Sequence, residues 1–504
     1  MATLFENDLK ALLPEVFLVF ALSFLLIFGS IYGTRKMGEK GSPILISPMV
    51  WLSSQSLFLA AVLSFHGKFQ EKSLLYGSLY FDSLAVNGKG SLFLVTALCL
   101  IASRAYLNRQ GIFAFEYPLL ILLSTFAMGL LISSYDLLAL YLALELQSLG
   151  LYVLATFQRG SAYSTEAGLK YFVVGAFSSG LLLFGISLIY GSTGTTSFED
   201  LSRILLDAGE LSTGIQGGLI FLSAGLLFKI AAVPFHMWIP DVYEGSPTSS
   251  TLFFAAIPKL AIIGSLVRLY YFAFYPMIFL WQGLLIFVSA SSMILAALAA
   301  LYQRKIKRFL AYSSIGHVGY LLIGLSSGSL EGLESMILYL LIYMLMTLNL
   351  WTVLLTTARW KEGSHERSPM KYMDELQVLG KLNPALAVTV GVAIFSMAGI
   401  PPMAGFCAKM YVFFSAMESS LYGLAIVGVL TTVVAAYYYL RWLKIMYFEK
   451  EVKGFQKSPY TYEILVDREK ALLLSTTSFF MLFFFANPSP LLVMAHEMAL
   501  SLSL

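Results

Sequence analysis

The sequence predicts an all-α polytopic membrane protein, and two observations carry this prediction. Hydrophobic residues make up 58% of the 504 residues and charged residues only 12%, with a mean hydropathy of +0.78. A soluble domain carries about 25% charged residues. In addition, apolar runs of about 20 residues, the length that crosses a bilayer as a helix, recur along the whole chain.

Polar breaks divide the chain into fourteen predicted transmembrane helices. The first run follows an acidic stretch without a small-residue cleavage site, so we expect it to be retained as a span. The run at 384–416 is too long for one straight span and contains Pro401 and Pro402, which predicts a broken helix. Three polar connections, 191–215, 358–383 and 446–469, each have room for a short surface helix. The predicted spans are 14–33, 46–66, 83–103, 112–132, 135–157, 165–190, 216–238, 248–272, 278–301, 308–327, 332–357, 384–416, 420–445 and 470–496.

The distribution of lysine and arginine supports this count. Of the 32 basic residues, 22 lie in loops that follow odd-numbered spans, which are all on one side of the membrane. Six lie on the opposite side, and four lie deep inside spans. Loops on the cytoplasmic or matrix side are enriched in Lys and Arg. Both termini are therefore expected on the outer side.

Composition also excludes several function classes. A net charge of +3 gives no indication of nucleic-acid binding, and two cysteines, Cys99 and Cys407, cannot supply a four-thiolate iron–sulfur site. The sequence contains neither GxGxxG nor a Walker loop, so we expect no flavin, nicotinamide or ATP site and no metal site in this chain.

Glu145 is the first ionisable residue predicted at membrane depth. It lies nine residues after Asp136 and fourteen before Arg159, or about 13 and 21 Å from the two helix ends. Charged groups at the bilayer centre are costly and usually functional. The alternative is a structural hydrogen-bond partner.

Three lysines are predicted at similar depth. Lys229 has about a dozen apolar residues before it, and Pro234 breaks its helix five residues later. Irregular backbone inside a membrane is tolerated only where it is buried in protein or lines a wet cavity. Lys259 follows Pro258, and Lys409 follows the break at Pro401 and Pro402. The alternative is that these side chains extend to the membrane surface.

Other polar residues are secondary candidates. His317 is placed to pass a proton between lysines and His236 lies at the first break, although either can be a packing residue. Lys170 is four residues after Glu166, which also fits a surface ion pair. Asp241 and Glu244 are expected to shape an inner entrance, whereas the tyrosines and phenylalanines are mostly expected to pack or face lipid.

Together these groups predict proton transfer. Burial disfavours a charged lysine and a nearby carboxylate favours it, so a buried Lys–Glu pair can bind and release a proton as its geometry changes. Sodium prefers oxygen ligands, and three lysines with one glutamate would repel it.

The broken helices suggest an internal repeat. Pro234 lies 122 residues after residue 112, and Pro401 lies 123 residues after residue 278. Each block holds five spans, so the second enters from the opposite face, which makes two inverted five-helix repeats. The predicted divisions are a three-helix segment (1–110), a first repeat (111–275), a second repeat (276–446) and a C-terminal loop with the last helix (447–504).

Five segments carry a family resemblance. They are LALYLALELQSLGLYVL, EAGLKYFVVGAFSSG, LLFKIAAVPFHMWIPDVYEGSPT, RFLAYSSIGHVGYLLIG and FSMAGIPPMAGFCAKMYVF. From about residue 115 onward the chain resembles the subunit 2 family of NADH dehydrogenase, the antiporter-like membrane subunits of respiratory complex I. The related subunit 4 family carries a glutamate at the position of Lys409, and the subunit 5 family is longer.

The resemblance implies a proton path through Glu145, Lys229, Lys259 and Lys409, with His317 in the connecting region. It implies a proton-translocating subunit of NADH:ubiquinone reductase that works beside other membrane-arm and antiporter-like subunits, with FMN, iron–sulfur clusters and ubiquinone elsewhere in the complex. The expected partners are those subunits, membrane lipids, water and protons. The expected location is the mitochondrial inner membrane of plants or algae, or alternatively a bacterial inner membrane. The competing functions are an Mrp-type cation/proton antiporter subunit and a non-pumping assembly scaffold.

Overall fold

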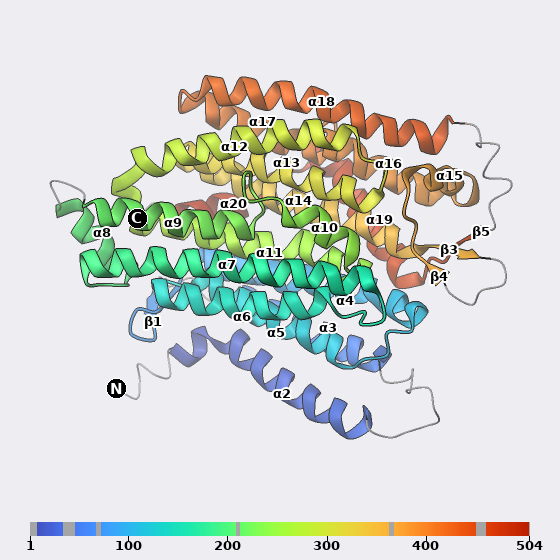
Figure 1. Cartoon of the computed structure of the whole chain (residues 1–504), viewed down its shortest axis with the longest axis horizontal. Coiled ribbons are helices and arrows are strands. Elements are labelled where there is room, and N and C mark those ends of the chain that lie inside the picture. Colours follow the sequence, from blue (N-terminus) through green and yellow to red (C-terminus); the bar gives the residue numbers. More distant parts are fainter. Residues whose placement is uncertain are drawn as a thin grey trace.

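A computed structural model describes residues 8–33, 46–66, 72–207, 212–361, 367–449 and 460–502. The fold is a bundle of long helices that lie roughly along one common direction (Figure 1). Within the described residues, twelve helices are long and apolar enough to cross a membrane, and two shorter apolar helices, Thr213–Lys229 and Pro384–Ala398, accompany them. The chain is therefore a mostly helical membrane protein.

The helices follow the apolar runs of the sequence closely. They are α2 (Leu13–Gly33), α3 (Ile46–Phe65), α4 (Ser83–Gln110), α5 (Glu116–Ser133), α6 (Leu137–Ala155), α7 (Ala162–Thr193), α8 (Phe198–Asp207), α9 (Thr213–Lys229), α10 (Trp238–Gly245), α11 (Thr248–Arg268), α12 (Ile278–Leu301), α13 (Ile306–Ser326), α14 (Leu330–Thr356), α15 (Gln377–Leu382), α16 (Pro384–Ala398), α17 (Ala404–Glu418), α18 (Tyr422–Tyr447), α19 (Arg468–Phe483) and α20 (Ser489–Leu500).

Three helices form the centre of the bundle. Nearly all residues of α11, α13 and α14 are buried, so these helices are surrounded by protein. By contrast, α2, α7, α12 and α18 keep exposed apolar faces that suit contact with lipid or with neighbouring subunits. Polar side chains on the three central helices therefore have no access to lipid and must find partners inside the protein.

The structure adds short strands to the predicted all-helical fold. A hairpin of β1 (Lys72–Leu74) and β2 (Leu79–Phe81) precedes α4. Strand β3 (Thr357–Lys361) pairs antiparallel with β4 (Arg367–Ser368) and β5 (Tyr460–Ile464). The strands β3, β4 and β5 lie at one end of the bundle, whereas α8 and β1 lie at the other (Figure 1).

Two of the three polar connections contain a short helix, as predicted. Helix α8 lies in 191–215, and the connection 358–383 carries α15 besides strands β3 and β4. In 446–469 the described part contains the strand β5 rather than a helix. Seven residues of the predicted charge asymmetry lie outside the described residues, namely Arg35, Lys36, Lys40, Lys68, Lys450, Lys453 and Lys457.

The last predicted span, 470–496, is wrong as a single helix. Helix α19 ends at Phe483, a short 3₁₀ turn follows, and α20 begins at Ser489. Asn487 has left the helical conformation, with φ −146° and ψ 78°, and a proline disfavours the helical conformation in the residue before it. Pro488 has no N–H with which to continue the helix.

Two basic residues assigned to outer loops are instead buried in the bundle. Lys89 lies inside α4 and forms an ion pair with Glu15, and both side chains are only 4% exposed. Arg268 at the end of α11 donates to Asp82 at 2.8 Å and to the Ile132 carbonyl at 3.1 Å. Asp82 also accepts from the Ala85 amide at 2.8 Å, which caps α4. These pairs join the N-terminal helices to the rest of the bundle.

We predict that Arg268→Met destabilises the assembled protein by about 3–5 kcal/mol, because it leaves the Asp82 carboxylate buried without a counterion. The thermal midpoint of the purified complex, followed by native electrophoresis, measures the loss. Asp82→Asn in the Arg268→Met background should recover much of the stability, because asparagine is neutral and still caps the helix.

The control is Arg203→Met, which removes an exposed pair with Glu199 on α8 and should cost less than about 1 kcal/mol. Equal losses for Arg203→Met and Arg268→Met would contradict the role assigned to the buried pair.

Candidate functional site

The first candidate site lies where the predicted seventh span is interrupted. Helix α9 ends at Lys229, and α10 begins nine residues later at Trp238. Ala231 has φ +60°, a left-handed conformation that strains a residue with a Cβ. The Val233 amide donates to Ser292 Oγ at 2.9 Å, and Trp238 Nε1 donates to the Phe228 carbonyl at 3.0 Å. The fold therefore supports an interrupted helix here, as Pro234 predicted.

The ammonium group of Lys229 has neutral neighbours. It lies 3.2 Å from Ser179 Oγ and 3.4 Å from the Tyr152 hydroxyl, and 5.8 Å from the centre of the Tyr152 ring. Lys229 also lies in the last turn of α9, where the helix dipole favours a cation.

Glu145 lies on the neighbouring helix α6 and is half-buried. Its carboxylate accepts from Ser148 Oγ at 3.5 Å. None of the ion pairs within the described ranges joins Glu145 to Lys229. The predicted Glu145–Lys229 pair therefore makes no direct contact in this structure.

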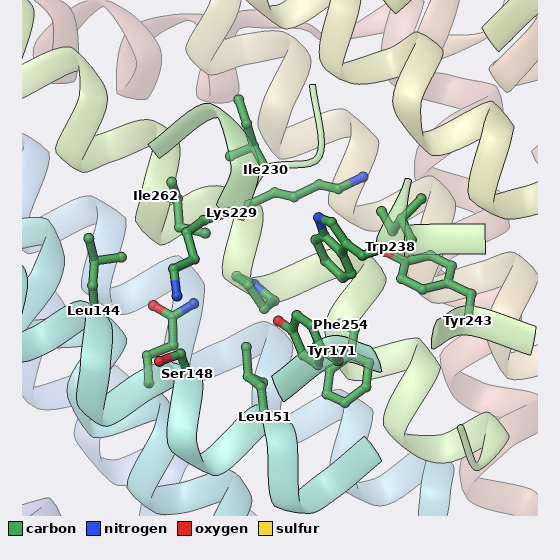
Figure 2. A pocket seen from close by; sticks show the side chains of 14 residues that line it. Leu144, Ser148, Leu151, Tyr171, Lys229, Ile230, Trp238, Tyr243, Phe254 and Ile262 are labelled. Carbon is green, nitrogen blue, oxygen red and sulfur yellow. The ribbon is translucent and has the colours of Figure 1, made fainter. Parts of the chain in front are cut away.

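A small cavity connects the first two lysines. Lys229 and Lys259 both line a space of about 20 Å³, which is enough for one water molecule. The buried Oε1 of Gln147, another lining residue, has no hydrogen-bond partner in the described part of the chain. Figure 2 shows Lys229 with Ser148 from α6 and Tyr171 and Trp238 around this cavity. A water in this cavity would provide Gln147 Oε1 with a hydrogen-bond donor.

Lys259 leads from this cavity to the centre of the bundle. It is buried in α11, and its ammonium group donates to the Tyr343 hydroxyl at 2.8 Å. It also lies 3.5 Å from the Ser314 carbonyl. Both partners belong to the central helices α13 and α14, so Lys259 is enclosed by protein.

His317 on α13 lies between two tyrosines. Its Nδ1 is 2.6 Å from the Tyr339 hydroxyl, and its Nε2 is 3.2 Å from the Tyr439 hydroxyl. Tyr439 also hydrogen-bonds Ser313. The ring of His317 lies 5.1 Å from that of Tyr343, measured between ring centres. Since Tyr343 contacts Lys259, the histidine is one residue removed from that lysine.

The second break holds Lys409 in a different way from the first. Helix α16 ends at Ala398, α17 begins at Ala404, and the ammonium group of Lys409 donates to the carbonyls of Met397 at 2.9 Å and Ala398 at 3.1 Å. Lys409 therefore folds back onto the negative end of the preceding half-helix.

Two glycines make this second arrangement possible. Gly399 has φ +83°, and a Cβ there would lie 3.0 Å from Lys409 Cδ. A Cβ on Gly405 would lie 1.9 Å from the Ser396 carbonyl oxygen. The half-helices α16 and α17 can approach this closely only because neither position carries a side chain.

A second small cavity lies between His317 and Lys409. Its volume is about 10 Å³, and its lining includes both residues together with Ser313, Tyr320, Thr431 and Tyr439. The ammonium group of Lys409 lies 5.0 Å from the centre of the Tyr320 ring. The candidates Lys229, Lys259, His317 and Lys409 thus form one continuous row through the protein.

The secondary candidates lie beside this row. Lys170 is partly exposed and pairs with Glu166 at 2.8 Å and with Asp241 at 2.9 Å. Arg308 pairs with Asp241 and Glu244, and Lys305 also pairs with Glu244. The predicted surface pair of Lys170 is present, and it belongs to a larger charged cluster at the start of α10 and α13.

His236 lies in the first break and is buried. Its Nδ1 has no hydrogen-bond partner within the described residues. It does not line the cavity that joins Lys229 and Lys259. The structure therefore places His236 next to the interrupted helix but outside the row of lysines.

Sequence reasoning missed the tyrosines of the row. Tyr343, Tyr339, Tyr439 and Tyr320 are buried and place their hydroxyls or rings against the lysines and the histidine. We expected tyrosines mainly to pack or face lipid, which is wrong for these four. The sequence did hold a sign that these tyrosines are polar partners: they occur in apolar helices that also carry other polar residues. An example is YLLIYMLMTLN around Tyr343, with Thr347 and Asn349.

Among the described residues, no cluster of three or more His, Cys, Asp or Glu side chains is arranged for a metal ion. The groups along the row are ammonium, imidazole and hydroxyl groups, which can exchange protons, and the amide of Gln147, which can hold a water by hydrogen bonds.

Known proteins share both the sequence and the fold of this chain. The profile of the family described as "NADH:quinone oxidoreductase/Mrp antiporter, TM" matches residues 134–435. NADH-ubiquinone oxidoreductase chain 2 of Marchantia polymorpha is 47% identical over 99% of this chain and all of the relative. NADH-quinone oxidoreductase subunit N 1 of Rhizobium meliloti is 46% identical over 88% of this chain and 89% of the relative.

Solved structures agree with the sequence comparison. A chain of respiratory complex I from Thermus thermophilus superposes with a TM-score of 0.77 at 29% identity, covering 95% of this chain and 98% of that one. A chain of the Mrp complex from Dietzia sp. superposes with a TM-score of 0.81 at 20% identity, covering 98% of each chain. The second likeness shows a shared fold.

The family profile spans more than half of the chain, and the relatives match the chain over nearly its full length. The chain therefore belongs to the NADH:quinone oxidoreductase/Mrp antiporter membrane family, together with the proteins called NADH-ubiquinone oxidoreductase chain 2 and NADH-quinone oxidoreductase subunit N.

Proposed function

We propose that this chain is a proton-translocating membrane-arm subunit of NADH:quinone oxidoreductase, respiratory complex I. The observation that carries the proposal is the continuous row of Lys229, Lys259, His317 and Lys409, joined by two small cavities and by tyrosine hydroxyls. Electron transfer from NADH to the quinone takes place in other subunits. FMN, the iron–sulfur clusters and the quinone site belong to those subunits.

The chain is a multi-pass membrane protein. The membrane is the mitochondrial inner membrane in plant-like relatives and the inner membrane of the cell in bacteria. Its partners are the other membrane-arm subunits, including neighbouring antiporter-like ones, together with lipid, water and protons. The end with β3, β4 and β5 faces the matrix or the bacterial cytoplasm, because most loop lysines and arginines lie there in the predicted topology.

We further propose fourteen spans, which adds the two broken pairs to the twelve long helices. The pair α9 and α10 and the pair α16 and α17 each make one interrupted span. Residues 111–275 and 276–446 then form two inverted five-helix repeats, preceded by a three-helix segment (1–110) and followed by 447–504. Each repeat has one break and one lysine beside it: Lys229 lies in the last turn of α9, and the ammonium group of Lys409 contacts the C-terminal carbonyls of α16.

Glu145 and Lys229 begin the path as a coupled pair. When the carboxylate and the ammonium group approach, the charged lysine is stabilised, and when they separate the lysine releases its proton. Ser179 and Tyr152 are the neutral neighbours of Lys229 in this structure. Their hydroxyls can hydrogen-bond the lysine both when it is charged and when it has lost its proton. Glu145 therefore controls the charge of Lys229 through distance.

The proton then passes along neutral hydrogen-bonding groups. A water in the first cavity, held by Gln147, connects Lys229 to Lys259. The Tyr343 hydroxyl bonds Lys259 and its ring packs against His317, so a bridging water or a rotation of the phenol carries the proton on to His317 and the second cavity. Lys409 then releases the proton toward the outer side. Imidazole and phenol can each accept a proton on one side and donate one on the other. His236 and Lys170 lie beside the path and are assigned to its first break and its inner entrance.

Replacing either member of the coupled pair should reduce pumping. In Lys229→Met or Glu145→Gln, proton passage through this chain should slow roughly 100-fold, because the positioned acid or base is lost. The measurement is the number of protons pumped per electron transferred to quinone in the assembled complex. An unchanged ratio in either variant would overturn the proposal, provided that Lys444→Met, an exposed control, assembles equally well.

The tyrosine contact of Lys259 provides a separate test. Tyr343→Phe removes only the hydroxyl that lies 2.8 Å from the ammonium group. A hydrogen bond to a charged group contributes about 1.5–3 kcal/mol, so pumping through this chain should fall by roughly 10- to 100-fold. The measurement is again protons per electron.

The matched control is Tyr270→Phe. It removes a buried hydroxyl that lies outside the row and hydrogen-bonds Ser223 Oγ at 3.0 Å. Pumping should remain normal in this variant. If Tyr343→Phe and Tyr270→Phe behave alike, the hydroxyl of Tyr343 is not part of the path.

The alternatives make different predictions. An Mrp-type cation/proton antiporter subunit would act without quinone reductase activity, and the similarity to the Mrp complex is at the level of the fold. Co-purification of the chain with NADH:quinone reductase activity separates the two. A non-pumping scaffold subunit would tolerate all of the substitutions above, provided that the complex assembles.

A further inference from the structure

A larger polar cavity lies apart from the row of lysines. Its volume is about 670 Å³, within the range of small-molecule sites. It lies where α4 ends and where α7, α11 and α13 begin. The lining residues that matter for its chemistry are Arg109, Tyr163, Glu244, Lys305, Lys307 and Lys371.

The charges around this cavity are predominantly positive. Four of its lining residues are basic, whereas Glu244 is the acidic one. That carboxylate already pairs with Lys305 and Arg308. Arg109 lies 3.6 Å from Asp467. Two positive charges, on Lys307 and Lys371, therefore remain without a carboxylate partner among the ion pairs of the described residues.

The backbone holds these two lysines close together. Lys307 lies in the first turn of α13, and its ammonium group donates to the Ser246 carbonyl at 2.8 Å. The Ile306 amide donates to the Lys371 carbonyl at 3.0 Å. The ammonium group of Lys371 lies 5.7 Å from the centre of the Tyr163 ring. Two basic side chains thus lie beside one cavity, where an anion would favour the charged form of both.

Three helix N-termini add to the positive potential. Helix α7 begins at Ala162, α11 at Thr248 and α13 at Ile306, and the lining includes residues at each start. The N-terminal caps Ser161, Pro247 and Lys305 make no side-chain capping hydrogen bond. Backbone amides at a helix N-terminus carry partial positive charge and favour anions.

We propose that this cavity binds a phosphate group, either the headgroup of an anionic phospholipid or a free phosphate. The cavity lies at the basic end of the bundle, beside the ends of membrane-spanning helices, where a lipid headgroup would reach it. Basic pockets between helices on the matrix or cytoplasmic side bind such headgroups. The phosphate oxygens would accept hydrogen bonds from the ammonium groups of Lys307 and Lys371 and compensate their charges.

The test follows the chemical labelling of Lys371, which is exposed in the absence of a ligand. The purified complex is placed in vesicles of phosphatidylcholine alone, of phosphatidylcholine with phosphatidylglycerol, or of phosphatidylcholine with added inorganic phosphate. The rate of lysine acetylation is then measured residue by residue by mass spectrometry. Lys444, an exposed lysine outside the cavity, is the internal reference.

Slower labelling of Lys371 but not Lys444 with phosphatidylglycerol identifies a lipid headgroup, and slower labelling with inorganic phosphate identifies a free anion. In Lys307→Gln the ligand concentration that gives half protection should rise about fivefold, since one positive charge near the membrane surface is lost. Lys444→Gln should leave it unchanged.

Equal labelling of Lys371 under all three conditions would overturn the proposal. So would protection of Lys371 in phosphatidylcholine alone accompanied by a cross-link to an acidic segment of another subunit, because the cavity would then be a protein contact. Neither result depends on proton pumping, which is measured separately.

Discussion

A charge buried in a membrane protein must be solvated by the protein itself, and this constraint shapes the whole molecule. Lipid offers no hydrogen bonds, so each ammonium group and each interrupted stretch of backbone needs a partner inside the bundle. The fold meets this need by placing Lys259 and His317 on helices that other helices enclose. The two interrupted helices supply carbonyls, serines and small cavities at the remaining positions.

The partners of the three lysines are mostly neutral, and this has a functional consequence. A lysine held by a carboxylate remains charged, whereas one held by hydroxyls and carbonyls can lose its proton at moderate cost. Lys229 contacts Ser179 and Tyr152, Lys259 contacts Tyr343, and Lys409 contacts two carbonyls. By contrast, Lys89 and Arg268 are buried against carboxylates and hold helices together. Under the proposed function, the same residue types thus serve transport in one setting and stability in the other.

Much of this organisation was predictable from the sequence. Apolar runs of spanning length placed the helices within a few residues, because helix length in a membrane follows from bilayer thickness. Prolines located both breaks, and the cost of burying charge singled out Lys259 and Lys409 as deep residues. These predictions depend on local rules that act along the chain.

The features that were missed depend on contacts between distant segments. Tyr343 and Tyr439 are ordinary aromatic residues until the fold brings their hydroxyls to Lys259 and His317. The burial of Lys89 depends on Glu15, 74 residues away. The final span required attention to Asn487 and Pro488, which long apolar runs on both sides obscured. Spacing along one helix cannot reveal such pairs.

In the proposed path, water and tyrosine hydroxyls connect the row of lysines. A structure of the whole complex at a resolution that reveals ordered water tests it most directly. The account predicts a water beside Gln147 Oε1 in the cavity between Lys229 and Lys259, and another between His317 and Lys409. Dry cavities at these two positions, in a map that shows water elsewhere in the membrane interior, would contradict it.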